Sequence, residues 1–146
     1  MGKIDQGVVM LWAACHLFRK DLTYIGYNGT GKQVRDVLHI DDLCDLVLTQ
    51  IGRIGEFQGE IFNAGGGLKN SVSLQEMTAI CQEITGGTIP IRVDPVTRPN
   101  DLIWYVTDNS QVSQTFGWEP HRSVRDTISD ITRWMNANRD IISNIL

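Results

Sequence analysis

The sequence predicts an α/β protein that combines mixed short strands with about five helices. Runs in which every second residue is apolar are typical of strands, and longer runs with apolar residues three or four positions apart are typical of helices. Both patterns alternate along the 146 residues, and glycine or proline separates them. The predicted helices cover residues 5–20, 41–50, 74–85, 108–116 and 123–138, and the predicted strands cover residues 22–27, 34–40, 60–64, 89–93 and 104–107.

The composition is that of an ordinary globular protein and argues against several classes of function. A net charge of −4 and a pI near 5.2 do not support a nucleic-acid partner. Cys15, Cys44 and Cys81 lie in helical patterns, so we expect reduced thiols in a cytoplasmic protein. Without a CxxC or histidine-rich cluster, no metal site is expected. The apolar run Val8–Phe18 has 11 residues, too few to span a membrane, and should instead be buried.

The most informative segment joins a glycine-rich turn, a short strand and the start of a helix. The turn Asn28–Gly31 contains residues that tolerate positive φ, and the strand that follows carries Arg35. An arginine held in this way suits a two-pronged contact with an anion, and it would equally suit an ion pair with Asp36 or another acid. We expect Asp41 or Asp42 to cap the next helix, whose apolar positions are Leu43, Leu46, Val47 and Ile51.

Three further features predict local structure. Gly65–Gly67 would form either a tight structural turn or a phosphate-binding loop, and the lack of G-x-G-x-x-G spacing favours the turn. Ser73 and Glu76 form a capping-box signature. Pro90 predicts an edge strand, and two later prolines hold a polar loop around Arg98. The helix after the capping box should bury Leu74, Met77, Cys81 and Ile84 and end at Gly86.

Four stretches carry a resemblance to a known family. They are GTGKQVRDVLHIDDLCDLV at 29–47, IFNAGGG at 61–67, RPND at 98–101 and GWEP at 117–120. In this order and spacing they resemble the C-terminal part of nucleotide-sugar epimerases in the extended short-chain dehydrogenase/reductase superfamily, which have a Rossmann-type fold. With DQG at 5–7, the pattern is similar to that of the CDP-paratose/CDP-tyvelose 2-epimerases, and the resemblance covers nearly the whole chain.

This resemblance implies a binding site for a nucleotide-diphosphate sugar, and we expect a CDP-sugar. Arg35 and Arg98 would clamp the diphosphate from two separate loops. Asp101 would accept hydrogen bonds from ribose hydroxyls or, alternatively, pair with Arg98. Backbone groups of Thr23–Ile25 would contact the base, with Tyr24 either stacking on it or packing in the core. No catalytic residue is expected in this chain.

The same resemblance implies NAD in the whole enzyme, held by an N-terminal part that this chain lacks. Gly26, Gly29 and Gly31 do not have the dinucleotide-binding spacing, and no tyrosine is followed four residues later by the family's catalytic lysine. Residues 1–146 would form the nucleotide-sugar-binding portion, with residues 41–64 belonging to the NAD-binding lobe. We therefore expect no turnover and no tight NAD binding by this chain alone.

The implied reaction of the whole enzyme is epimerisation through transient oxidation at C2 of the sugar. Binding energy from the nucleotide would hold the intermediate while it turns in the site. Related members of the superfamily are 4-epimerases, dehydratases or decarboxylases, and a non-catalytic nucleotide-sugar-binding remnant is another alternative. The apolar first helix and a strand from the centre of a larger sheet would leave apolar surface uncovered. We therefore expect association with the missing N-terminal half or a homo-oligomer.

Overall fold

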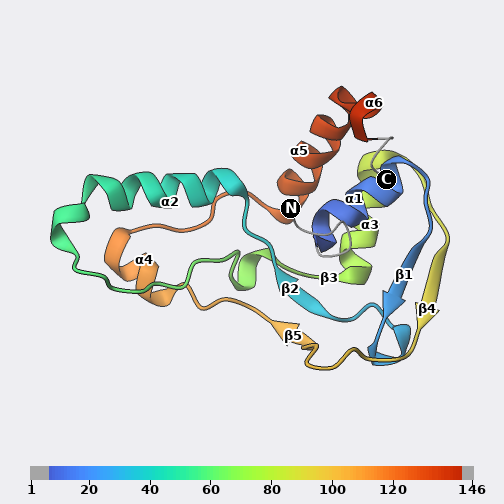
Figure 1. Ribbon diagram of the computed structural model, residues 1–146, viewed down its shortest axis with the longest axis horizontal. Coiled ribbons are helices and arrows are strands. Elements are labelled where there is room, and N and C mark those ends of the chain that lie inside the picture. Colours follow the sequence, from blue (N-terminus) through green and yellow to red (C-terminus); the bar gives the residue numbers. More distant parts are fainter. Residues whose placement is uncertain (1–6, 143–146) are drawn as a thin grey trace. The chain divides into compact units, whose positions relative to one another are not determined.

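A computed structural model of the chain describes residues 7–142 (Figure 1). The predicted start of the first helix and two residues of the DQG stretch lie outside this range. The described residues confirm the α/β class. The strands are β1 (Leu22–Ile25), β2 (Val34–Asp36), β3 (Ser71–Ser73), β4 (Ile91–Asp94) and β5 (Trp104–Tyr105). The α-helices are α1 (Val8–Leu17), α2 (Ile40–Gly52), α3 (Leu74–Thr85), α4 (Ser110–Phe116), α5 (Val124–Ala137) and α6 (Arg139–Ile142).

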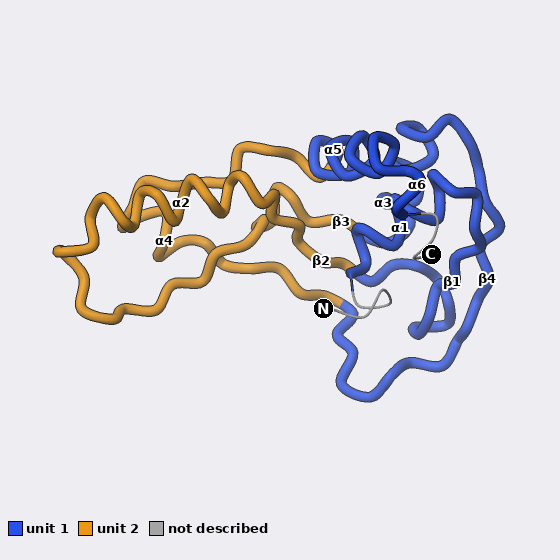
Figure 2. Tube along the Cα trace, turned by 45° about the horizontal axis from the view of Figure 1, so that its top comes forward, with its two compact units in different colours: residues 1–33, 73–103, 125–146 blue, residues 34–72, 104–124 orange. Residues whose placement is uncertain are grey.

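The chain divides into two compact units (Figure 2). Unit 1 comprises residues 1–33, 73–103 and 125–146, and unit 2 comprises residues 34–72 and 104–124. Each unit therefore collects segments that are far apart in the sequence.

Unit 1 is built on a pair of parallel strands and four helices. β1 and β4 pair along their whole lengths, ending with Ile25 opposite Asp94 (Figure 1). α1 packs against α3, and residues 12–16 of α1 are all buried. This burial confirms the expectation that a helix apolar on nearly all sides needs cover. The expectation that this helix would leave apolar surface uncovered is wrong, because α3 and the core of unit 1 cover it. A core cluster contains Ala14 of α1, Met135 of α5 and Ile142 of α6.

The start and end of α3 follow from local signals. Ser73 Oγ accepts a hydrogen bond from Glu76 N at 3.2 Å, and the Glu76 carboxylate accepts one from Ser73 N at 2.8 Å. The predicted capping box is therefore confirmed. Gly86 ends the helix in the left-handed conformation at φ +69°. On the predicted stripe, Met77 and Cys81 are fully buried and Leu74 and Ile84 are half-buried.

Several strands are shorter than predicted, and the local backbone explains two of the differences. β1 ends at Ile25 because Gly26 turns the chain at φ +81°, and residues 27–29 form a 3-10 turn. β4 begins only after Pro90, since proline has no N–H to donate to a strand partner. β2 and β5 span only three and two residues respectively.

Unit 2 contains a three-stranded sheet, α2 and α4. The strand order is β3-β2-β5, and β2 runs parallel to β5 with Arg35 opposite Tyr105. The predicted strand at 60–64 is wrong for the described chain, because neither sheet supplies it with a hydrogen-bonded neighbour. The core contains buried Leu46, Val112 and Trp118, with partly buried Leu38, Phe62, Ala64 and Phe116 packed against them.

The start of α2 also differs from the prediction. His39 is the cap in place of Asp41 or Asp42, and its Nδ1 accepts a hydrogen bond from Asp41 N at 3.1 Å. Asp42 is fully buried and binds a distant turn. Its carboxylate accepts hydrogen bonds from His121 N at 3.1 Å, from Arg122 N at 3.0 Å and from Arg122 Nη1 at 2.6 Å. A long-range interaction thus engages the carboxylate that the local pattern assigned to the cap.

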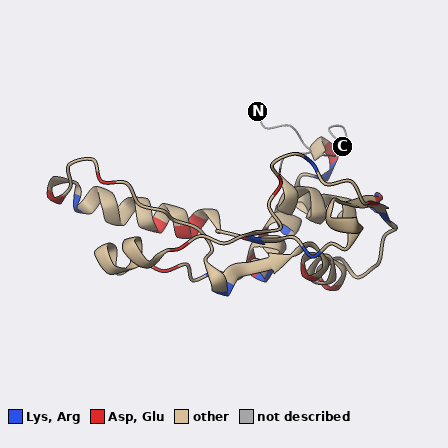
Figure 3. Cartoon of the chain, turned by 90° about the horizontal axis from the view of Figure 1, so that it is seen from below, with Lys and Arg blue, Asp and Glu red and all other residues tan. Residues whose placement is uncertain are grey.

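α2 exposes most of its apolar side chains. Among its predicted apolar positions only Leu46 is buried, while Val47 and Ile51 are 42% and 58% exposed. Beyond Asp45 the helix carries no charged residue as far as its end at Gly52 (Figure 3). An apolar face of this extent on a helix is typical of a surface that another part of a protein covers.

Candidate functional site

In unit 1, a turn and a loop meet beyond the carboxyl ends of β1 and β4. Because the two strands are parallel, the turn after β1 and the loop after β4 leave the sheet at the same edge. Gly26 N donates to the Asp94 carbonyl at 2.8 Å. Tyr27 adds two hydrogen bonds, from its N–H to Thr97 Oγ1 at 2.9 Å and from its hydroxyl to the Asp101 carbonyl at 2.7 Å. The loop is therefore attached to the turn at several points.

This loop carries two of the predicted site residues, Arg98 and Asp101. Asp101 N donates to the Arg98 carbonyl at 3.2 Å, which closes a tight turn in which Asn100 has φ +61°. Arg98 is exposed and Asp101 is half-buried. The arginine and the carboxylate thus occupy the first and last positions of one short turn.

Tyr24 and Ile25, also predicted site residues, lie on β1 in the same unit. The Tyr24 ring stacks on Trp12, with centroids 6.3 Å apart, and its hydroxyl shares a hydrogen bond with Thr78 Oγ1 at 2.8 Å. The Ile25 carbonyl accepts a hydrogen bond from Gln33 Nε2 at 2.6 Å. These contacts favour the packing alternative for Tyr24, and a contact between β1 and a base stays a prediction.

Arg35 lies on β2 in unit 2 and is half-buried. Its Nη1 donates to the Val34 carbonyl at 2.7 Å. Asp36, the acid considered as its alternative partner, accepts a hydrogen bond from Gly67 N at 3.0 Å. Arg35 and Asp36 are thus ordered on the strand, in contact with the backbone of their own unit.

The contacts of Gly65–Gly67 favour the structural turn over a phosphate-binding loop. Gly65 forms two hydrogen bonds with the Asn109 side chain, at 3.0 and 2.9 Å, and Gly67 N is bound to Asp36. A Cβ on Gly66 would lie 2.2 Å from the Val37 carbonyl oxygen. Close backbone packing therefore requires glycine here, and two of the three N–H groups already have protein acceptors.

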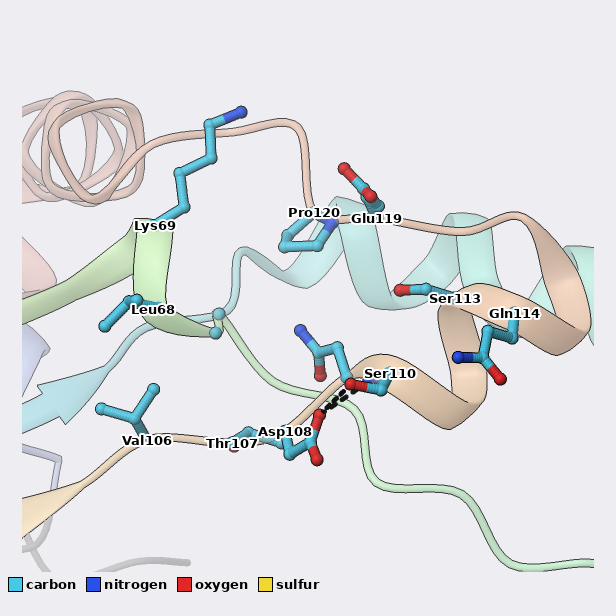
Figure 4. A pocket seen from close by; sticks show the side chains of 13 residues that line it. Leu68, Lys69, Val106, Thr107, Asp108, Ser110, Ser113, Gln114, Glu119 and Pro120 are labelled. Carbon is cyan, nitrogen blue, oxygen red and sulfur yellow. Dashed lines mark hydrogen bonds between the residues drawn. The ribbon is translucent and has the colours of Figure 1, made fainter.

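Unit 2 also contains a cavity of about 600 Å³ that the sequence did not predict (Figure 4). Asp108, at its wall, accepts hydrogen bonds from Ser110 Oγ and N, which hold the pKa of its carboxyl below the usual value. None of the predicted site residues lines the cavity. No single motif could have revealed it, since the wall comes from three separate parts of the chain: residues 66–69, residues 106–110 with 113 and 114, and residues 119–120.

Neither a metal-binding cluster nor a membrane-spanning helix is found in the part of the chain that the structure describes. Within residues 7–142, no three or more His, Cys, Asp or Glu side chains come together in a way that could hold a metal ion. Within the same range, no helix has both the length and the apolar character needed to cross a membrane.

The known proteins that the chain resembles include nucleotide-sugar epimerases and dehydratases. No family model matches the chain. CDP-paratose 2-epimerase from Salmonella typhi is 31% identical over 110 residues, which cover 75% of this chain and 32% of that protein. dTDP-glucose 4,6-dehydratase from Xanthomonas campestris is 29% identical over 128 residues, 81% of this chain and 35% of that protein. The chain therefore spans about a third of the length of the curated relatives it matches.

A solved structure of an epimerase has a similar fold. The crystal structure of UDP-glucuronic acid 4-epimerase from Bacillus cereus, in complex with UDP-glucuronic acid and NAD, superposes with a TM-score of 0.78. The match covers 93% of this chain and 41% of that one, at 22% sequence identity. This likeness confirms that the two units have the fold of a part of a Rossmann-type epimerase.

Proposed function

Since the chain is related to the NAD-dependent nucleotide-sugar epimerases and dehydratases, we propose that it forms the part of such an enzyme that holds the nucleotide-diphosphate sugar. The observation that carries the proposal is the anchored turn in unit 1, which presents Arg98 and Asp101 beyond the end of β1. Ligands of open α/β sheets bind beyond the carboxyl ends of the strands, where this turn lies.

The chemistry of the proposed residues suits a nucleoside diphosphate. Arg98 in unit 1 would bind the diphosphate, because the planar guanidinium donates to two oxygens at once, and the same chemistry makes Arg35 in unit 2 a second candidate. Asp101 would accept hydrogen bonds from the ribose hydroxyls, and the backbone at Thr23–Ile25 would contact the base. Cytosine is the base we favour, because the relative from Salmonella typhi is a CDP-paratose 2-epimerase.

The glycines at 29 and 31 do not have the surroundings of a dinucleotide-binding turn. A Cβ on Gly29 would lie 2.1 Å from the Val93 side chain, and one on Gly31 would lie 2.8 Å from the Tyr24 ring. These glycines therefore make room for side chains of the chain itself, and the segment continues into β2 instead of a helix. In the whole enzyme NAD would supply the transient oxidation, at C2 in a 2-epimerase, while this chain binds and orients the sugar nucleotide.

We also propose that residues 41–64 pack in the NAD-binding lobe of the whole enzyme. Three observations support this: the apolar face of α2 is exposed, Ile61 is 87% exposed, and the segment 60–64 has no strand partner in the described chain. All of these residues lie in unit 2, which also includes residues 104–124. A sheet contributed by the two thirds of the relatives' length that this chain does not match would cover this surface.

The 2-epimerase assignment has an alternative within the same family. The relatives include a dTDP-glucose 4,6-dehydratase and a UDP-glucuronic acid 4-epimerase. The same diphosphate contacts would serve each of these substrates, so nucleotide preference separates them. Titration with CDP, UDP and dTDP tests this point, and tighter binding of UDP or dTDP than of CDP would favour the alternative.

Arginine-to-lysine substitutions test the diphosphate contacts. Arg35→Lys and Arg98→Lys keep the charge and remove the two-pronged geometry. A charge-assisted hydrogen bond contributes about 1.5–3 kcal/mol, so we expect each change to weaken CDP binding about tenfold or more. Arg133→Lys is the matched control, because Arg133 is 76% exposed and pairs with Asp130 within α5. Unchanged CDP affinity in Arg98→Lys would make Arg98 a structural residue and refute its proposed role.

A further inference from the structure

Tyr27 has a backbone conformation that is unusual for an aromatic residue. Its φ is +49°, in the left-handed region, and its neighbours Gly26 and Asn28 have φ +81° and +60°. Glycine and asparagine tolerate this region, but a bulky side chain there is strained and persists only when surrounding contacts hold it. We therefore looked for the contacts that maintain Tyr27 in this conformation.

Both polar groups of Tyr27 bind the loop that carries Arg98. The N–H donates to Thr97 Oγ1 at 2.9 Å and the hydroxyl donates to the Asp101 carbonyl at 2.7 Å. These two acceptors lie on either side of Arg98, one position before it and three positions after it. With its left-handed backbone, Tyr27 thus holds the loop on both sides of Arg98.

The Tyr27 ring offers no competing explanation. Within residues 7–142, it takes part in none of the close aromatic pairs, whereas the Tyr24 ring stacks on Trp12. Tyr27 is only half-buried, so its contribution to a core is limited. The loop in turn approaches the turn closely: a Cβ on Gly26 would lie 3.2 Å from Thr97 Cα.

We infer that Tyr27 is the positioning residue of the turn that presents Arg98 and Asp101 to the nucleotide. The inference rests on the proposed function for its ligand, but the attachment of the loop can be measured without any ligand. Tyr27 would act by holding the loop on both sides of Arg98, so that the loop is already ordered when Arg98 meets the diphosphate.

The first test is amide hydrogen exchange of the 146-residue chain without ligand. Tyr27→Phe removes only the hydroxyl, and Thr97→Val removes only the acceptor of the Tyr27 N–H. Each should make amides of residues 95–103 exchange roughly two- to tenfold faster, the effect of losing one uncharged hydrogen bond. Thr88→Val, at an exposed position outside the loop, is the matched control and should change nothing. Unchanged loop exchange in both Tyr27→Phe and Thr97→Val would overturn the inference.

The second test asks whether the attachment serves nucleotide binding. Tyr27→Phe should reduce the preference of the chain for CDP over cytidine roughly two- to tenfold, and it should have little further effect in a chain that already carries Arg98→Ala. A role in stability alone would lower the melting temperature and leave that preference unchanged, which would overturn the inference. If the unmodified chain does not prefer CDP to cytidine, the proposed function fails, and hydrogen exchange still decides whether Tyr27 positions the loop.

Discussion

Substitution of Asp42, whose carboxylate is buried, should lower the stability of unit 2 more than substitution of any other single residue. Three hydrogen bonds of 2.6–3.1 Å reach it from His121 N, Arg122 N and Arg122 Nη1. The Asp42 carbonyl also accepts a bond from Trp118 Nε1 at 2.9 Å. One residue near the start of α2 therefore fastens the segment that leads out of α4.

The size of the effect follows from what Asp42→Ala leaves behind. Two partly buried backbone N–H groups would lose their acceptor, at about 1–3 kcal/mol each. Arg122 is 37% exposed and would keep much of its hydration, so we expect a loss of about 2–6 kcal/mol, mainly from these two N–H groups. Asp42→Asn keeps one carbonyl oxygen as acceptor, so its loss should be smaller.

Urea unfolding followed by far-UV circular dichroism would measure these losses. Asp45→Asn is the matched control, because Asp45 lies on the same helix and approaches Arg122 at 3.4 Å but is 56% exposed. An exposed pair of this kind contributes little to stability. If Asp42→Ala were no more destabilising than Asp45→Asn, the claim that the hydrogen bonds of the Asp42 carboxylate stabilise unit 2 would be refuted.

Three further predictions concern pH, close packing and association. Burial, with a smaller contribution from Arg19, lowers the pKa of His16 below its usual value near 6.5. The unfolded chain therefore binds the proton more readily, and the free energy of unfolding should fall as pH drops below about 6.5 and stay level above it. His16→Leu should abolish this slope in urea unfolding between pH 5.5 and 7.5, and the exposed control His121→Gln should keep it. Gly66→Ala should lower the melting temperature, because the added Cβ would lie 2.2 Å from the Val37 carbonyl oxygen and disrupt unit 2. Gly52→Ala is the control: its added Cβ would have nothing within 4 Å, so the melting temperature should not change. The exposed apolar face of α2 should make the isolated chain self-associate, and sedimentation showing a compact monomer at high concentration would contradict this.

Features determined by neighbouring residues could be predicted from the sequence. The capping box of Ser73 and Glu76 and the glycine end of α3 depend on contacts within a few positions, so the pattern alone was sufficient. The burial of α1 was predictable for a similar reason, since it is apolar on nearly all sides.

Features determined by distant residues could not be predicted. Asp42 has the pattern of a helix cap, but its carboxylate binds a turn nearly eighty residues away. Residues 60–64 have the pattern of a strand, but a strand needs a partner that the described chain does not provide. Among the proposed site residues, the sequence indicated Arg98 and Asp101 through their motif, but not Tyr27, whose proposed role depends on an unusual φ and two long-range hydrogen bonds.

The measurement that tests the account most directly is isothermal titration of the 146-residue chain with CDP, cytidine and NAD in parallel. If the chain holds the nucleotide-diphosphate end of a sugar nucleotide, CDP should bind about tenfold or more tightly than cytidine, and added salt should reduce this difference. NAD should show no micromolar binding. Equal affinities for CDP and cytidine, or micromolar affinity for NAD, would contradict the account.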